Sequence, residues 1–188
     1  MNVVQPIRDK RVIEGILAYL KEQNERDFVL FNLGIYTGLR ISDILALRVG
    51  DVRGTHISLR EQKTNKPKLV PLNPALRQIL KEYIKGKDDT EYLFQGRSMK
   101  LKSYLRKQPI DRSTVYKMLN KAAKHFGLRD IGCHTMRKTF GYHLYMKDHR
   151  NLALLMKIFN HSSETVTLLY IGITQDTIDS AVNGLSFT

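Results

Sequence analysis

Residues 133–140 read C-H-T-M-R-K-T-F and residues 160–170 read N-H-S-S-E-T-V-T-L-L-Y, and the rest of the chain is organised around these two motifs. They place His134, Arg137, His161 and Tyr170 in that order, shortly before the chain ends at residue 188. Cationic and hydrogen-bonding groups followed by a single phenol suit chemistry on a phosphate. Each of these residues is ordinary alone, so the prediction depends on the ordered set.

Length and composition describe one soluble globular domain. The 188 residues are enough for one good core, and 42% hydrophobic and 26% charged residues are ordinary proportions. No apolar run approaches the ~18 residues that a membrane span needs, and the N-terminus lacks the apolar region of a signal peptide. Cys133 is the single cysteine, so a disulfide framework is excluded and a reducing, cytoplasmic setting is expected.

The charge is strongly positive and unevenly distributed. Thirty-one Lys and Arg against 18 Asp and Glu give +13. Residues 60–112 carry 14 basic and 6 acidic side chains, a net +8, whereas residues 151–188 carry one lysine and three acids, a net −2. A basic middle and a slightly acidic tail indicate two surfaces, of which one faces a polyanion. The alternative is a basic face that only contacts solvent.

Hydrophobic spacing predicts a mostly helical chain with a small antiparallel sheet, an α+β fold. We expect Asp27 and Ser42 to cap the second and third helices, and Asn73 to cap the fourth. A short strand is also possible at residues 92–94. The expected helices span residues 8–22, 28–37, 43–47, 74–85, 134–147, 151–159, 163–170 and 175–183, with a further one from Asp111 or Ser113 to Phe126.

Residues 55–72 read as a hairpin. His56, Ser58 and Arg60 alternate with Ile57 and Leu59, the period of a half-buried strand, and turn residues follow before the returning strand. The hairpin carries Lys63, Lys66 and Lys68 at or near its tip, and we expect Lys66 and Lys68 to contact a nucleic acid. A second basic stretch surrounds Tyr104, where basic and aromatic residues together suit contacts to a nucleic-acid backbone, unless the loop is merely solvated; it holds Arg97, Lys100, Lys102, Arg106 and Lys107.

The candidate site residues each have a plainer interpretation. His134 and Arg137, three apart on a helix, face the same side but are often only a surface pair. His161 could cap or pack, and Tyr170 could be a core aromatic. A phenol with a pKa near ~10 needs cationic neighbours to act as a nucleophile, and the chain offers Arg40, Arg137 and Lys63.

These residue types supply every part of a phosphoryl transfer that uses no metal. An arginine fork binds two phosphate oxygens and keeps its charge, while a desolvated lysine is the better proton donor. The sequence has no acidic cluster with the spacing of a magnesium site, so protein cations are expected to replace the metal.

Four motifs together resemble the catalytic domain of the tyrosine recombinase (phage integrase) family over nearly the whole chain. They are T-G-L-R-I-S-D-I-L-A-L at 37–47, Q-K-T-N-K-P-K-L-V-P-L at 62–72, H-T-M-R-K-T-F at 134–140 and N-H-S-S-E-T-V-T-L-L-Y-I at 160–171. The resemblance implies that fold, and a site-specific DNA strand transferase that needs neither metal nor ATP and holds no cofactor. It also implies double-stranded DNA as partner, and a dimer or tetramer on that DNA, with no membrane involved.

The resemblance also implies roles for individual residues. Arg40 and Arg137 match the phosphate-binding arginines, and Asp43 matches an acidic residue, more often Glu, that orients the arginine. Tyr170 matches the nucleophile that forms a 3′-phosphotyrosyl bond. The remaining matches are Lys63 to the general acid for the 5′-oxygen, His134 to the acid/base histidine and His161 to a histidine that holds the phosphate.

The chain departs from the family pattern in two places. Lys138 stands where many members have a second histidine. The family usually carries a helical core-binding domain before the catalytic one, whereas only about seven residues precede the first helix expected here, so we treat 1–188 as a single catalytic domain. An excised fragment and a short one-domain member remain alternatives. The apolar tail at 172–188 is expected to pack on a neighbouring protomer, or else on its own domain.

Two rival functions and one rival site are also compatible with the sequence. One is a DNA-binding module of the same fold without independent catalysis, and another is a type IB topoisomerase that relaxes supercoils with similar groups. The third is a metal site built from His125, Cys133 and His134. Covalent trapping on a nicked duplex distinguishes the DNA-binding module, which forms no adduct, from the recombinase and the topoisomerase. Activity that persists in a chelator would exclude the metal site.

Overall fold

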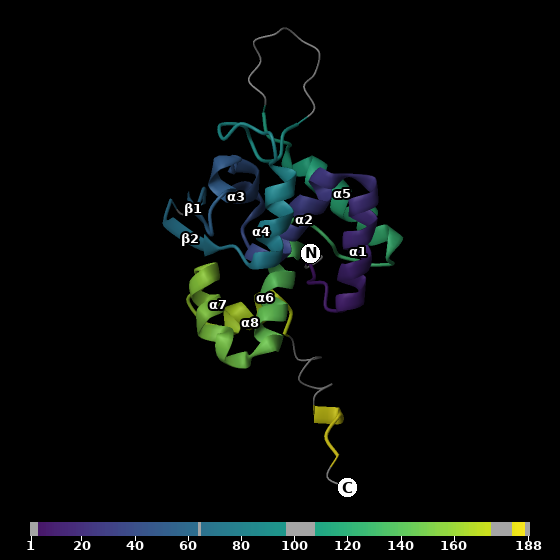
Figure 1. Ribbon diagram of the computed structural model, residues 1–188. Coiled ribbons are helices and arrows are strands. Elements are labelled where there is room, and N and C mark those ends of the chain that lie inside the picture. The colour runs from purple at the N-terminus through teal and green to yellow at the C-terminus, as the bar shows by residue number, and fades with distance from the viewer. Residues whose placement is uncertain (1–3, 64, 97–107, 174–181, 187–188) are drawn as a thin grey trace.

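The computed structural model describes residues 4–63, 65–96, 108–173 and 182–186, and in these ranges the predicted helical fold with a two-stranded antiparallel sheet is present (Figure 1). The elements in chain order are α1 (Lys10–Gln23), α2 (Glu25–Thr37), α3 (Ile41–Ala46), η1 (Gly50–Val52), β1 (His56–Arg60), β2 (Pro67–Pro71), α4 (Pro74–Tyr83), α5 (Arg112–His125), α6 (Thr135–Lys147), η2 (His149–Asn151), α7 (Leu152–Phe159) and α8 (Glu164–Ile171). No helix in the described ranges is long and apolar enough to cross a membrane.

The helix spans were predicted better than the helix caps. Asn73 caps α4 as expected, since its side chain accepts a hydrogen bond from the Leu76 amide. The prediction for Asp27 is wrong, because α2 begins earlier and Asn24 accepts the Asp27 amide. The prediction for Ser42 is also wrong, because α3 begins directly after Arg40 without a side-chain cap.

The sheet has the predicted hairpin form, with β1 and β2 paired from His56↔Pro71 to Arg60↔Pro67. Residues 92–94 form no strand; Tyr92 makes only an isolated bridge with Arg48. The expected helix at 175–183 falls mostly on residues outside the described ranges.

A large core fills the space between α1–α5 and the inner face of the sheet. Its centre is α2, where Leu30, Phe31 and Leu33 are fully buried, and Ile57 of β1 and Phe94 are equally inaccessible. Burial of apolar side chains on this scale supplies most of the stabilisation of a domain of this size. We call this region the large core.

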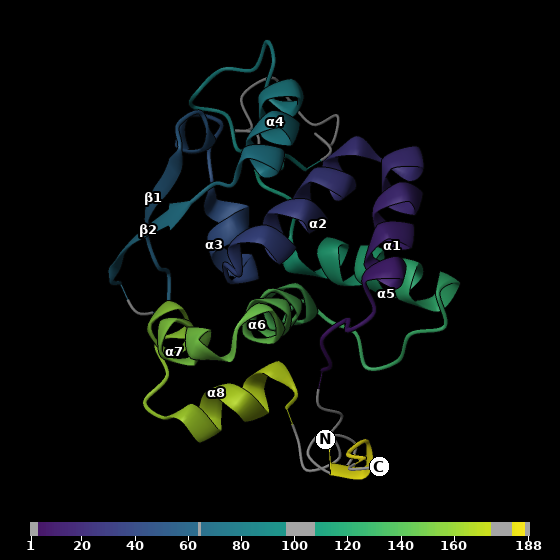
Figure 2. The same ribbon diagram turned by 60° about the horizontal axis from the view of Figure 1, so that its bottom comes forward.

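A second, smaller group of apolar residues lies at the other side of α6. Leu155 and Phe159 of α7 and Ile171 of α8 are its fully buried members, packed beneath Phe140 and its neighbours on α6. Figure 2 shows α7 and α8 beside α6 and away from α1 and α5. We call this region the C-terminal cluster.

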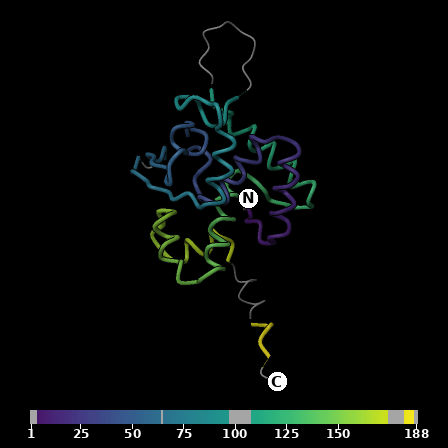
Figure 3. The backbone as a smooth tube through the Cα atoms, in the orientation of Figure 1, coloured from purple at the N-terminus to yellow at the C-terminus, as the bar shows by residue number. Residues whose placement is uncertain are grey.

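Helix α6 lies between the two regions, and glycines let it pack closely against α2 on one side and against α7 and α8 on the other. A Cβ on Gly34 of α2 would lie 2.6 Å from the Met136 sulfur of α6, and a Cβ on Gly141 of α6 would lie 2.7 Å from atoms of Phe159 and Ile171. The chain path in Figure 3 shows α7 lying next to the hairpin although about ninety residues separate them. The N-terminus of α6 therefore lies at the junction of the two regions.

Candidate active site at the junction of two cores

The candidate residues lie where the large core meets the C-terminal cluster. Arg40 stands between α2 and α3, and Arg137 lies in the first turn of α6, three residues after His134 at the helix N-cap. His161 lies in the turn between α7 and α8, and Tyr170 is near the end of α8. Packing of two separate regions therefore sets the distances among these groups.

Arg137 is buried and connects the two regions. Its Nη1 donates a hydrogen bond to the carbonyl oxygen of Gly38, which ends α2, and its Nη2 donates to the carbonyl of Phe159 at 3.4 Å. The guanidinium carbon lies 4.4 Å from the centre of the Phe159 ring. Since a guanidinium carries five N–H donors, these two contacts leave others for a ligand.

Tyr170 is close to both a histidine and an arginine. The Tyr170 hydroxyl oxygen lies 3.3 Å from His134 Nδ1, and the Tyr170 ring packs edge-on against His161 at 5.0 Å between ring centres. Burial raises the pKa of the Tyr170 phenol, while the charges of Arg137 and Arg40 and a hydrogen bond with Arg137 oppose that rise. The phenol is therefore neutral at pH 7 and needs a base before it can attack.

His134 has the electrostatic properties of such a base. Burial lowers its pKa, and the nearby charges of Arg112, Arg137, Lys138 and Arg40 lower it further. A neutral imidazole at pH 7 can accept the phenol proton through Nδ1.

His161 is oriented by Thr167. The Thr167 hydroxyl donates to the Ser163 carbonyl at 3.1 Å, so His161 Nδ1, 3.1 Å away, must donate to the Thr167 oxygen. The proton therefore resides on Nδ1 in the neutral ring, and Nε2 donates only when the ring is protonated. Burial lowers the His161 pKa, and the charges of Arg137 and Arg40 add to that shift.

Arg40 contacts two carboxylates. Its Nη1 lies 2.6 Å from an oxygen of Glu61 and 4.0 Å from Asp43 Oδ2. Among the described residues, Nη1 of Arg40 and Oδ2 of Asp43 are buried atoms that make no hydrogen bond. A guanidinium carries five N–H donors, so Arg40 has donors other than those of Nη1 with which it can bind a phosphate oxygen.

Asp43 also holds the hairpin. Its Oδ1 accepts a hydrogen bond from the Gln62 amide at 2.9 Å, which attaches the turn after β1 to α3. Lys63 follows on that turn with an exposed side chain. The structure therefore brings together Arg40, Arg137 and three further groups, namely His134, His161 and Tyr170, and it places Lys63 on the exposed turn beside them.

The other hairpin lysines differ from each other. The Lys66 ammonium donates to the Asn160 side chain at 3.2 Å and is exposed. Lys68 instead reaches into the junction, where its ammonium donates to Glu61 at 3.1 Å and to the Ile158 carbonyl at 2.7 Å. The remaining predicted DNA-contacting residues lie outside the described ranges: Arg97, Lys100, Lys102, Arg106 and Lys107.

Sequence reasoning missed Glu61 at the junction and named Lys138 only as a departure from the family pattern. Glu61 continues the inward series of Ile57 and Leu59 at a spacing of two, so strand alternation could have identified it. Lys138 is buried and its ammonium lies 5.1 Å from the centre of the Tyr170 ring, a contact that no local pattern indicates.

The alternative metal site does not form. His125 stacks on Tyr19, buried Cys133 contacts the Arg112 carbonyl, and His134 faces Tyr170. In the ranges that the structure describes, no group of three or more His, Cys, Asp or Glu side chains is placed to hold a metal ion.

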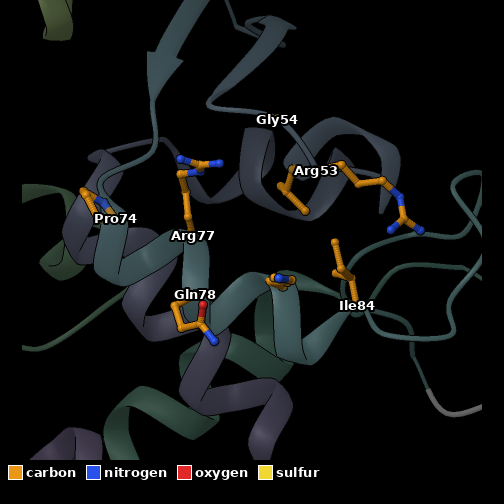
Figure 4. Close-up of a pocket in the computed structure, with 8 residues that line it drawn as sticks. Arg53, Gly54, Pro74, Arg77, Gln78 and Ile84 are labelled. Atoms are coloured by element: carbon orange, nitrogen blue, oxygen red, sulfur yellow. The ribbon is translucent and has the colours of Figure 1, made fainter.

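A second basic region lies at the opposite end of the hairpin. A pocket of about 550 Å³ lies between the start of β1 and α4. Figure 4 shows Arg53 and Arg77 among the residues that line it. Arg53 already pairs with Asp89 and donates to the Lys87 carbonyl at 3.0 Å. The pocket lining contains no tyrosine or histidine, so the junction remains the candidate active site.

Comparison with known proteins agrees with this geometry. The phage integrase family matches residues 8–176. A Bacillus subtilis protein named probable integrase/recombinase YoeC is 43% identical over 182 residues, which cover 96% of each chain. The predicted family is thereby confirmed.

Solved structures agree with the predicted fold. The XerA recombinase crystal structure has a TM-score of 0.73 at 17% identity and covers 98% of this chain and 66% of its own. XerH recombinase bound to its difH substrate before cleavage has a TM-score of 0.69 at 20% identity, over 96% of this chain and 54% of XerH. The chain thus spans about half to two thirds of these larger recombinases. The predicted fold class is confirmed, and the chain belongs to the phage integrase family.

Proposed function

We propose that this chain cuts and rejoins DNA strands at specific sites through a 3′-phosphotyrosyl intermediate, with Tyr170 as the nucleophile. The observation that carries the proposal is the 3.3 Å approach of His134 Nδ1 to the Tyr170 hydroxyl beside buried Arg137. A phenol, a neutral base and a fixed guanidinium then meet at one point.

The first step forms a bond between the Tyr170 oxygen and a backbone phosphorus and breaks the bond from that phosphorus to the 5′-oxygen. His134 accepts the phenol proton, and Lys63 donates a proton to the departing 5′-oxygen. Arg40 and Arg137 bind the non-bridging oxygens, whose charge grows in the transition state. The negative charge of the bound phosphate favours protonation of His161, which can then donate to the phosphate through Nε2. Attack by another 5′-hydroxyl reverses these steps and joins a new strand.

We propose that the reaction needs neither a metal ion nor ATP. The cations around the Tyr170 hydroxyl supply the charge neutralisation that magnesium provides in other phosphoryl transfers. The phosphotyrosyl ester conserves the phosphodiester linkage, so rejoining needs no nucleotide. Action on cellular DNA also implies a cytoplasmic location.

The experiment is covalent trapping on a nicked duplex whose short 5′ fragment diffuses away after cleavage. We expect a protein–DNA adduct that survives denaturant, forms in EDTA and disappears in Tyr170→Phe. Tyr145→Phe, a partly buried tyrosine in the same cluster, is the matched control and should retain the adduct. Intact DNA binding without an adduct would instead support the DNA-binding module.

We also propose that the chain works as a dimer or tetramer on double-stranded DNA, with the tail at 172–188 packed on a neighbouring protomer. Ile173, at the start of the tail, packs on the C-terminal cluster of its own chain. Support for packing on a neighbour comes from residues 182–186, where Val182 and Leu185 are 59% and 64% exposed. Exposed apolar side chains on a chain end favour burial against a partner. Val182→Glu/Leu185→Glu should abolish assembly on a two-site duplex in light scattering, while binding to a single site is retained. Unchanged assembly would contradict tail packing.

A further inference from the structure

Glu61 is a buried carboxylate among the cations of the junction. It follows β1, and the alternation that buries Ile57 and Leu59 turns Glu61 to the same face, where it is 4% exposed. A carboxylate in such a position is unfavourable unless cations compensate its charge. The surroundings of Glu61 provide that compensation.

Two cations from separate elements share this carboxylate. Arg40 Nη1 lies 2.6 Å from Glu61 Oε1, and the Lys68 ammonium donates to the same oxygen at 3.1 Å. Lys68 sits opposite Leu59 in the sheet register, so its side chain also faces inward. The Lys68 ammonium further donates to the Ile158 carbonyl near the end of α7. Glu61 thereby connects Arg40 to the hairpin and, through Lys68, to the C-terminal cluster.

The contact fixes Arg40 at one end of its guanidinium. Nη1 forms a close ion pair with Glu61, although it makes no hydrogen bond within the described residues. Charge attraction holds the guanidinium in place, and a guanidinium has five N–H donors, so others remain for a ligand. Without Glu61, the cations Arg40, Lys68 and Arg137 would repel one another across the junction.

We propose that Glu61 is a positioning residue of the strand-transfer site: with Lys68, it holds Arg40 in the place where Arg40 binds the scissile phosphate and fixes the hairpin that carries Lys63 relative to Tyr170. This role rests on the function proposed above. Glu61 itself, an anion, is not expected to touch the phosphate. Its effect on the reaction is transmitted through Arg40 and Lys68.

The proposal predicts opposite effects on cleavage and on binding. Removing the charge in Glu61→Gln should slow cleavage because Arg40 loses its anchor, and misplacement of a catalytic group by about 1 Å can cost roughly 10²-fold. DNA binding should stay equal or become tighter, because a negative charge is removed from a surface that binds a polyanion. If Glu61 had a merely structural role, its substitution would lower the cleavage rate and the DNA binding together, in proportion to the folded fraction.

The test measures single-turnover adduct formation on the nicked duplex, DNA affinity by fluorescence anisotropy at fixed salt, and the melting temperature. Variants are Glu61→Gln, Glu61→Asp and the double variant Glu61→Gln/Lys68→Met, with exposed Glu22→Gln on α1 as control. We expect Glu61→Gln to cleave roughly 10- to 100-fold more slowly than the wild type with unweakened affinity. Glu61→Asp, which keeps the charge, should recover part of the rate, and Glu22→Gln should match the wild type.

Lys68 provides an independent check on the network. If Glu61 and Lys68 act together, Lys68→Met in the Glu61→Gln background should add less than it does in the wild type. Full additivity of the two effects would overturn the joint role.

Each remaining outcome has a definite meaning. An unchanged or faster rate in Glu61→Gln overturns the positioning role, and so does a rate that falls in step with affinity. If Glu61→Gln does not fold, Glu61→Asp decides: it must cleave more slowly with unweakened affinity. Absence of an adduct with the wild-type chain would overturn the proposed function and this role with it, whereas a wild-type adduct formed equally fast by Glu61→Gln overturns this role alone.

Discussion

The large core and the C-terminal cluster differ in how they are held. The large core is continuous through five helices and the sheet, whereas the C-terminal cluster has only Leu155, Phe159 and Ile171 fully buried. Polar contacts from Arg137 and Lys68 to backbone carbonyls of α7 add to its attachment. The cluster that carries Tyr170 is therefore the more weakly held region, and one of the two side chains that attach it, Arg137, is also a proposed phosphate-binding group.

Arg137→Ala should have the largest effect, because Arg137 serves both regions. Cleavage should fall by about 10²–10³-fold, the usual result of removing a transition-state donor. The free energy of unfolding should also fall by about 1–3 kcal/mol, since the Gly38 and Phe159 carbonyls lose their donors.

Adduct kinetics and chemical denaturation measure the two effects of Arg137→Ala separately. Arg150→Ala, an exposed arginine paired with Asp148, is the control and should change neither. Normal cleavage by Arg137→Ala would show that the junction is not the site.

Lys63→Met should have the next largest effect, and it should depend on the leaving group. Loss of a general acid costs about 10²–10⁴-fold. A 5′-sulfur leaving group needs no proton, so a bridging phosphorothiolate substrate should restore most of the rate. The measurement is single-turnover cleavage of both substrates.

Lys66→Met and Lys68→Met separate the roles of the hairpin lysines. With DNA in excess, Lys66→Met should cleave at nearly the wild-type rate, because exposed Lys66 is predicted to contact DNA and not to donate the proton. The slower cleavage expected of Lys68→Met should not be restored by the 5′-sulfur substrate. If the 5′-sulfur substrate restored the cleavage rate of Lys68→Met but not that of Lys63→Met, Lys68 and not Lys63 would be the proton donor.

Phe159→Ala and Phe31→Ala compare the two cores directly. Each removes a fully buried ring, which costs about 3–5 kcal/mol. In Phe159→Ala, hydrogen exchange should accelerate in α7 and α8 while α2 keeps its protection, because the C-terminal cluster can open separately. In Phe31→Ala, protection should fall throughout. Equal acceleration everywhere in both variants would show that the two regions form one cooperative unit.

Acid should lower the free energy of unfolding, by less than the substitutions above. Burial lowers the pKa of His134 and of His161 in the folded chain, whereas both should titrate near ~6.5 when unfolded. The unfolded chain therefore binds more protons as the pH falls through about 6.5, so the free energy of unfolding should fall below that pH.

Melting temperatures between about pH 5 and pH 8 test this expectation. His161→Gln should flatten the dependence, since it removes one of the two titrating groups. A dependence as steep in His161→Gln as in the wild type would assign the effect to other groups.

The sequence predicted local structure well where spacing alone decides it. Apolar periodicity placed α1, α5 and α6, and the alternation at Ile57 and Leu59 placed β1. The cap at Asp27 was wrong because Asn24 caps a helix that begins earlier, and the cap at Ser42 was wrong because α3 begins after Arg40 without a side-chain cap; apolar spacing does not define these first residues.

The site was predictable from motifs only in part. The motifs singled out Arg40, Arg137 and Tyr170 as candidates, but the sequence does not show how these groups meet across two cores. Glu61 and Lys68 acquire their place from the sheet register and from α7, so a one-dimensional pattern could indicate only that they face inward.

The most direct test of the account identifies the residue bound to DNA. After trapping on the nicked duplex, the adduct is digested with nuclease and protease and the nucleotide-bearing peptide is sequenced by mass spectrometry. We predict a single phosphonucleotide on Tyr170, one of nine tyrosines in the chain. Attachment to any other tyrosine, or to a serine, would contradict the account.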